Sequence, residues 1–113
     1  MSTPSSTDPF QALADPTRRA LLMSVAERPR PVNELAEGFE MSRPGVSKHL
    51  RILASAGLVR FTPGERDARQ RIVHAELAAV AQLESYLDKL RGFWRARLDK
   101  LGDVLDAMDD QAR

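Results

Sequence analysis

The chain has 113 residues, a formal net charge of +1 and no cysteine. The length fits one domain with a modest core, and the absence of cysteine excludes disulfides and thiolate metal sites. No apolar run approaches the roughly 20 residues of a membrane span, and the N-terminal sequence has no signal-peptide pattern. We therefore expect a cytoplasmic protein that does not contact a membrane.

Two Asp-Pro pairs organise the N-terminal part of the chain. We interpret residues 1–7 as a disordered lead. Asp8-Pro9 and Asp15-Pro16 each place a capping carboxylate before a proline at the first helical position. They predict a short helix that carries Phe10, followed by a longer helix over residues 16–26. The prolines of "ERPRP" end this second helix.

The next two predicted helices are joined by a short turn. Pro31 is expected at the first position of a helix in "PVNELAEGF", with Gly38 just beyond its end. A further helix is predicted over residues 42–56, closed by Gly57. Its apolar residues recur at helical spacing and form the expected inner face. They are Val46, Leu50, Leu53 and Ala54. Two short helices with a tight turn are typical of a helix-turn-helix.

After Gly57 the periodicity changes from helix to strand. "LVRFT" alternates apolar and polar residues, "PGERDA" supplies turn residues, and "RQRIVHA" can return as a second strand. A basic β-hairpin after a helix-turn-helix is a wing. The expected fold is mainly α with a small β-hairpin wing and about five helices. Residues 8–75 form the winged helix-turn-helix, and residues 76–113 form a C-terminal helix of the same compact domain.

Residues 76–113 are predicted to form a long C-terminal dimerisation helix. Apolar residues recur every seven positions, and a second apolar row shifts by one position after Arg97. Such a stripe must be covered, most simply by the same helix of a second copy. The alternative is a helix that folds back on its own domain. The predicted dimer interface comprises Phe10, Leu83, Leu87, Leu90, Trp94, Leu98, Leu101 and Leu105.

Positive charge is concentrated in the middle of the chain. Residues 41–74 carry seven basic and two acidic side chains, a net charge of +5, whereas each flanking part has a net charge of −2. This distribution favours binding of a polyanion in the middle part. The alternative is a solvated surface with a chance cluster of charge.

The start of the predicted helix over residues 42–56 is suited to a DNA groove. With Ser42 as N-cap, Pro44 and Gly45 lie in the first turn, where backbone N–H groups have no intrahelical partner. A bare Gly45 allows close approach of the backbone, and the helix dipole favours phosphate. We predict that Ser47 and Lys48 contact bases, while Arg43 and Arg51 mainly contact phosphates.

The role of two further groups stays open. His49 adjoins the apolar face, so a structural histidine and a phosphate contact are both compatible with its position. In the hairpin, Arg66, Arg69 and Arg71 are candidate DNA contacts, although Glu65 and Asp67 can pair with them instead. The predicted DNA-binding residues are Ser42, Arg43, Pro44, Gly45, Ser47, Lys48, His49, Arg51, Arg66, Arg69 and Arg71.

Three segments resemble the ArsR-like (arsenic-repressor) family of bacterial winged-helix regulators. They are "FQALADPTRRALL", "VNELAEGFEMSRPGVSKHLRILASAGLV" and "YLDKLRGFWRARLDKLGDVLD". The resemblance implies a homodimer that places two recognition helices on successive major-groove faces of a double-stranded operator, about 34 Å apart. It also implies repression of the protein's own or neighbouring genes.

The departures from the family pattern concern metal binding and the wing. Metal-sensing members carry Cys pairs near the helix that corresponds to residues 32–37, or His with carboxylates on the terminal helix. This chain has no cysteine, and its histidines are His49 and His74. The resemblance therefore implies the metal-independent branch, with no cofactor and an effector of unknown identity. Gly45 stands where Ala is common, and Ala68 where the wing usually has Gly.

Two alternative functions compete with that of a DNA-binding regulator. A winged helix can serve as a protein-interaction module with only nonspecific DNA affinity. An enzyme is not expected, because the chain lacks cysteine, a Gly-rich phosphate loop and a supported Ser/His/Asp set. Ser47 and His49 are two residues apart and point to different helix faces.

Overall fold

The computed structural model describes residues 7–111. The predicted lead over residues 1–7 lies, except for Thr7, outside the described residues, as do the last two residues of the predicted terminal helix. Thr7 is hydrogen-bonded to Ser55. Its backbone N–H donates to the Ser55 carbonyl over 3.2 Å, and the two hydroxyl oxygens are 2.9 Å apart.

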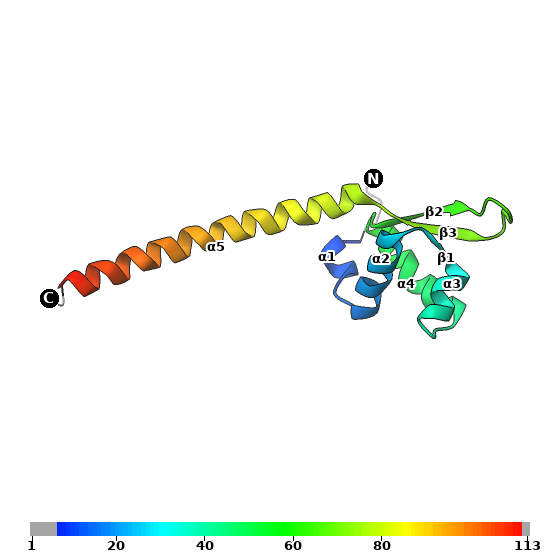
Figure 1. Ribbon diagram of the computed structural model, residues 1–113, viewed down its shortest axis with the longest axis horizontal. Coiled ribbons are helices and arrows are strands. Elements are labelled where there is room, and N and C mark those ends of the chain that lie inside the picture. Colours follow the sequence, from blue (N-terminus) through cyan, green and yellow to red (C-terminus); the bar gives the residue numbers. More distant parts are fainter. Residues whose placement is uncertain (1–6, 112–113) are drawn as a thin grey trace. The chain divides into compact units, whose positions relative to one another are not determined.

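Residues 7–111 form five helices and one three-stranded antiparallel sheet, which confirms the winged helix-turn-helix fold with a long C-terminal helix (Figure 1). The chain divides into two compact units between Ala81 and Gln82. The elements are α1 (Pro9–Ala12), α2 (Pro16–Glu27), β1 (Arg30–Pro31), α3 (Val32–Gly38), α4 (Arg43–Ser55), β2 (Val59–Pro63), β3 (Arg71–Ala75) and α5 (Leu77–Gln111).

The two Asp-Pro pairs cap α1 and α2 as predicted. The Asp8 carboxylate accepts from the Phe10 N–H over 2.8 Å, and Asp15 accepts from the N–H groups of Thr17 and Arg18 over 2.7 and 3.2 Å. Hydrogen bonding from the Arg18 N–H is the main reason why the pKa of Asp15 lies below its ordinary value of 3.8. The negative charge of this cap is therefore stabilised by the start of α2.

The predicted start and end of α3 were wrong by one position each. Pro31 is not the first helical residue: with Arg30 it forms β1, and α3 begins at Val32. Proline is tolerated there because β1 is an edge strand, which bonds to a neighbour on one side only. Gly38 is the last helical residue, and the left-handed position in the following turn is Glu40, with φ of 53°.

The sheet contains one strand that the sequence pattern did not predict. The strand order is β1-β3-β2, with Arg30 opposite Val73 and Phe61 also opposite Val73 on the other side. Two residues are too short to show the alternation by which a strand is recognised. β1 is therefore defined by its pairing with β3 and not by a pattern of its own.

The core of the first unit lies beneath α4. The predicted inner residues Val46, Leu50 and Leu53 are buried, whereas Ala54 is half-buried. Leu21 and Val73 are also fully buried in this core. The helix α4 packs against α2, α3 and β2. Burial of this face leaves the opposite face of α4 to solvent.

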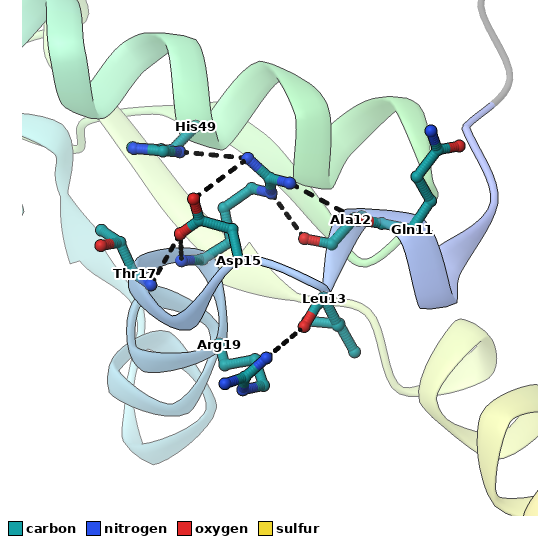
Figure 2. A network of polar contacts seen from close by, with 8 residues as sticks. Gln11, Ala12, Leu13, Asp15, Thr17, Arg19 and His49 are labelled. Carbon is teal, nitrogen blue, oxygen red and sulfur yellow. Dashed lines mark hydrogen bonds and ion pairs between the residues drawn. The ribbon is translucent and has the colours of Figure 1, made fainter.

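Arg18 joins α1, α2 and α4. Figure 2 shows its partners Ala12, Asp15 and His49 around one network of polar contacts. The Arg18 guanidinium, with 15% of the side chain exposed, donates to the Ala12 carbonyl and lies 3.4 Å from His49 Nδ1 and 3.9 Å from the Asp15 carboxylate. A guanidinium only donates hydrogen bonds, so the neutral His49 ring accepts through Nδ1. One side chain therefore connects the end of α1 and the cap of α2 with α4.

We expect Arg18→Met to lower the free energy of unfolding by about 1–3 kcal/mol, because it leaves the Ala12 carbonyl without its donor. Arg19→Met is the matched control: the Arg19 side chain is exposed, and its guanidinium donates to the Leu13 carbonyl over 2.8 Å, where water can replace it. Urea unfolding at one fixed protein concentration measures both variants. Equal losses of stability for the two would contradict the role of Arg18.

Candidate nucleic-acid interface

The first turn of α4 has the predicted cap geometry. Ser42 Oγ accepts from the Gly45 N–H over 3.1 Å, and Pro44 follows Arg43 in the first turn. A Cβ added at Gly45 would lie 3.1 Å from Ser42 Oγ and 3.5 Å from Met41 Cε. The missing side chain therefore also keeps the capping hydroxyl free of crowding.

The solvent-facing side of α4 is cationic. Arg43, Lys48 and Arg51 are exposed, as are Ser42 and Pro44, while Ser47 is half-buried. Within residues 7–111 none of these three cations forms an ion pair. Their positive charge is therefore available to an anion that approaches this face.

His49 lies on a different side of α4, next to α2. It is half-buried, and its Nδ1 faces Arg18. With Nδ1 accepting, the proton of the neutral ring is on Nε2. The contact with Arg18 gives His49 a structural role, and a phosphate contact through Nε2–H stays a prediction.

The wing arginines differ in their surroundings. Arg66 and Arg69 are exposed, and Arg69 Nε lies 3.3 Å from the Asp67 carboxylate, a surface pair of small energetic value. The Arg71 guanidinium lies over the Phe61 ring, 4.1 Å from its centroid. The predicted competition from Asp67 is confirmed for Arg69, whereas Glu65 makes no ion pair within the described part of the chain.

Gly64, which lies in the predicted turn segment "PGERDA", shapes the wing loop. Gly64 N–H donates to the Gln70 carbonyl over 2.8 Å, and Gln70 N–H donates to the Asp67 carbonyl over 3.0 Å. A Cβ at Gly64 would lie 2.6 Å from the Asp67 carbonyl oxygen, which the backbone could not accommodate without shifting. The glycine that this wing needs is therefore Gly64, the first residue of the loop after β2, and position 68 can be alanine.

The start of α4 and the wing meet at a small hollow of about 100 Å³, which we call the α4–wing hollow. It brings together predicted residues from both elements with two polar residues, Asn33 and Gln70, that were not predicted. Lys48, His49, Arg51 and Arg66 do not line it. The lining residues are Val32, Asn33, Arg43, Ser47, Arg69, Gln70 and Arg71.

The predicted dimer residues lie on α1 and α5. No residue of α5 is buried in the single chain, and Leu87 and Trp94 are 53% and 56% exposed. Leu83 is half-buried, whereas Phe10, Leu90, Leu98, Leu101 and Leu105 are exposed. In the second unit, Phe93, Trp94, Leu98, Leu101 and Val104 line a shallow apolar surface on α5.

Residues 7–111 contain no group of three or more His, Cys, Asp or Glu side chains that could hold a metal ion. None of the helices described here combines the length and apolar character needed to cross a membrane.

Comparison with known proteins agrees with this geometry. The family model "Bacterial regulatory protein, arsR family" matches residues 15–60. The HTH-type transcriptional regulator Rv2034 of Mycobacterium tuberculosis is 38% identical over 111 residues, which cover 97% of this chain and 98% of that protein. The HTH-type transcriptional repressor SmtB of the same species is 38% identical over 80 residues, 64% of this chain and 57% of that protein.

A solved structure extends the likeness to the fold. The ArsR-like transcriptional regulator from Rhodococcus sp. RHA1 superposes with a TM-score of 0.70 at 26% identity, covering 84% of this chain and 87% of that one. The full-length similarity and the family match together establish what kind of protein this is. The chain belongs to the ArsR family, and it is a winged helix-turn-helix, DNA-binding transcriptional regulator and not an enzyme.

Proposed function

We propose that this protein is a homodimeric, sequence-specific repressor of its own or neighbouring genes, which acts in the cytoplasm. The observation that carries the proposal is the exposed, unpaired cationic face of α4 beside a basic wing. A protein-interaction module with only nonspecific DNA affinity is the alternative. The name of the similar SmtB protein, a transcriptional repressor, supports repression over activation.

The α4 helix reads the operator in this proposal. Its start, from Ser42, enters the major groove, where Ser47 and Lys48 contact base edges. Arg43 and Arg51 contact phosphates on either side, and Gly45 lets the backbone approach closely. Arg66, Arg69 and Arg71 reach the backbone or the adjacent minor groove. For His49 a phosphate contact through Nε2–H is the alternative to a purely structural role beside Arg18.

A dimer supplies two such helices. The apolar residues of α5 are exposed along its length in the single chain, an unfavourable arrangement that a second α5 would relieve. A pair of α5 helices, joined by Phe10 from α1, would present two α4 helices to half-sites about 34 Å apart.

We also propose that operator binding needs no metal ion. The chain has no cysteine, and both of its histidines have polar partners: His49 faces Arg18, and His74 Nε2 lies 2.7 Å from Thr62 Oγ1. Any effector of this protein would then be something other than a metal ion.

The first test separates base contacts from phosphate contacts. We expect Lys48→Ala to reduce the preference for the operator over random duplex by about 1–3 kcal/mol, because a base contact is lost. Arg51→Ala should weaken binding to both duplexes alike and reduce the salt slope by about 1. Fluorescence anisotropy with the gene's own upstream DNA, at two salt concentrations, measures both effects.

Arg28→Ala is the matched control for that titration, because Arg28 lies outside α4 and the wing and is already paired with Glu34 over 2.7 Å. It should bind as the wild type does. Wild-type affinity that is the same at both salt concentrations would argue against any DNA contact by this face. Binding without operator preference would favour the protein-interaction alternative.

The second test concerns the dimer. We expect Leu87→Asp and Trp94→Asp to dissociate or unfold the protein, because each would bury an unpaired charge in the interface. Sedimentation velocity and thermal unfolding report the two outcomes. Ser85→Asp adds the same charge at another exposed position of α5 and should leave both unchanged. Unaltered mass and stability in the first two variants would show that the stripe is not the interface.

The third test concerns metal. We expect neither added Zn²⁺ nor a chelator to change the dissociation constant of the operator complex, because Zn²⁺ sites in proteins are built from Cys, His and carboxylate ligands held together. The anisotropy titration is repeated under each condition. A saturable change of affinity with zinc concentration would show that a metal site exists and that this proposal is wrong.

A further inference from the structure

We infer that the α4–wing hollow binds one backbone phosphate of the DNA, and that Asn33 and Gln70 donate hydrogen bonds to it. The inference rests on the proposed function. It adds two neutral residues and a definite place on the protein to the predicted contacts.

The charge of the hollow selects an anion. Three arginines and no carboxylate line it, and the Asp67 carboxylate of the wing loop is paired with Arg69. Arg43 makes no ion pair within residues 7–111, and Arg71 is held against Phe61. The lining is therefore cationic even after the Asp67 charge is counted.

The size and polarity of the hollow fit a phosphate group. Its volume of about 100 Å³ exceeds the roughly 30 Å³ that one water occupies in the liquid. Val32 is the one apolar residue in its lining, and Ser47, Asn33 and Gln70 add side-chain donors to the guanidinium groups. Arginines with neutral amide and hydroxyl donors are common partners of DNA phosphates.

The two amide residues are placed by backbone contacts that do not depend on DNA. Asn33 is the second residue of α3 and is exposed. Gln70 is half-buried, and its N–H and carbonyl are bonded to Asp67 and Gly64 in the wing loop. A phosphate in the hollow would thus contact α3, α4 and the wing at once, and it would set the register of α4 along the backbone.

Because Asn33 and Gln70 are neutral, their loss should change the DNA affinity and its salt dependence differently from the loss of an arginine. A lost phosphate hydrogen bond should lower affinity for operator and random duplex equally, by about tenfold, because phosphates carry no sequence information. The salt slope should not change, because an amide releases no counterion, whereas Arg43→Ala should reduce it by about 0.9.

The decisive experiment combines protein variants with single methylphosphonate substitutions along the operator. In the wild type, one neutralised phosphate per half-site should weaken binding strongly. In Asn33→Ala/Gln70→Ala the same substitution should cost less, since a coupled pair is not additive. Asn33→Asp, which places a like charge in the hollow, should weaken binding further, whereas Gln82→Glu on α5 adds the same charge elsewhere and should not.

The outcomes separate this inference from the proposed function. Wild-type protein that binds the operator, with Asn33→Asp and the double variant binding equally well, would overturn the phosphate site alone. Additive effects at every methylphosphonate position would do the same. Competition by inorganic phosphate that is lost in the double variant would show anion binding in the hollow without DNA. Wild-type protein that binds neither duplex would overturn the proposed function itself.

Discussion

Burial of one face of α4 is the constraint on which the interface depends. Val46, Leu50 and Leu53 are buried, and each contributes about 1.5–3 kcal/mol to the folded state. Because successive side chains rotate by 100° around a helix, burying this stripe forces Lys48 and Arg51 outward, whereas Arg43 is exposed as the first residue of α4. The same apolar contacts thus stabilise the domain and orient its cations, so stability and DNA binding are coupled through α4.

The α4 face brings together cations that have no carboxylate partner within residues 7–111. Elsewhere in the described residues, Arg28, Arg30, Arg60 and Arg91 have carboxylate partners. The cations of α4 have none, and the helix N-terminus adds its own partial positive charge. Unpaired cations close to one another repel, and a bound polyanion would offset that repulsion. This concentration of positive charge supports DNA binding by a chain whose net charge is only +1.

The polar contacts beneath α4 show how its position is held. Arg18 contacts the end of α1, the cap of α2 and His49 of α4, and the wing loop is closed by bonds between Gly64, Asp67 and Gln70. Both sets use backbone carbonyls as acceptors. They fix the two sides of the α4–wing hollow, so the residues proposed to bind phosphate are preorganised before DNA arrives.

Short-range features of this protein followed from the sequence alone. The caps Asp8, Asp15 and Ser42, the buried stripe of α4 and the apolar rows of α5 each involve residues within a few positions, so spacing and side-chain chemistry were enough to predict them. The exposure of Lys48 and Arg51 on the opposite side of α4 followed for the same reason.

The tertiary structure decided what depends on distant residues. Strand β1 exists because Arg30 and Pro31 meet β3, about 40 positions later, and a two-residue strand has no pattern of its own. Asn33 and Gln70 lie on different elements and share the hollow only after folding. The Arg18–His49 contact spans 31 residues. Periodicity reports which face of an element is buried, but packing of the whole chain determines which elements meet there.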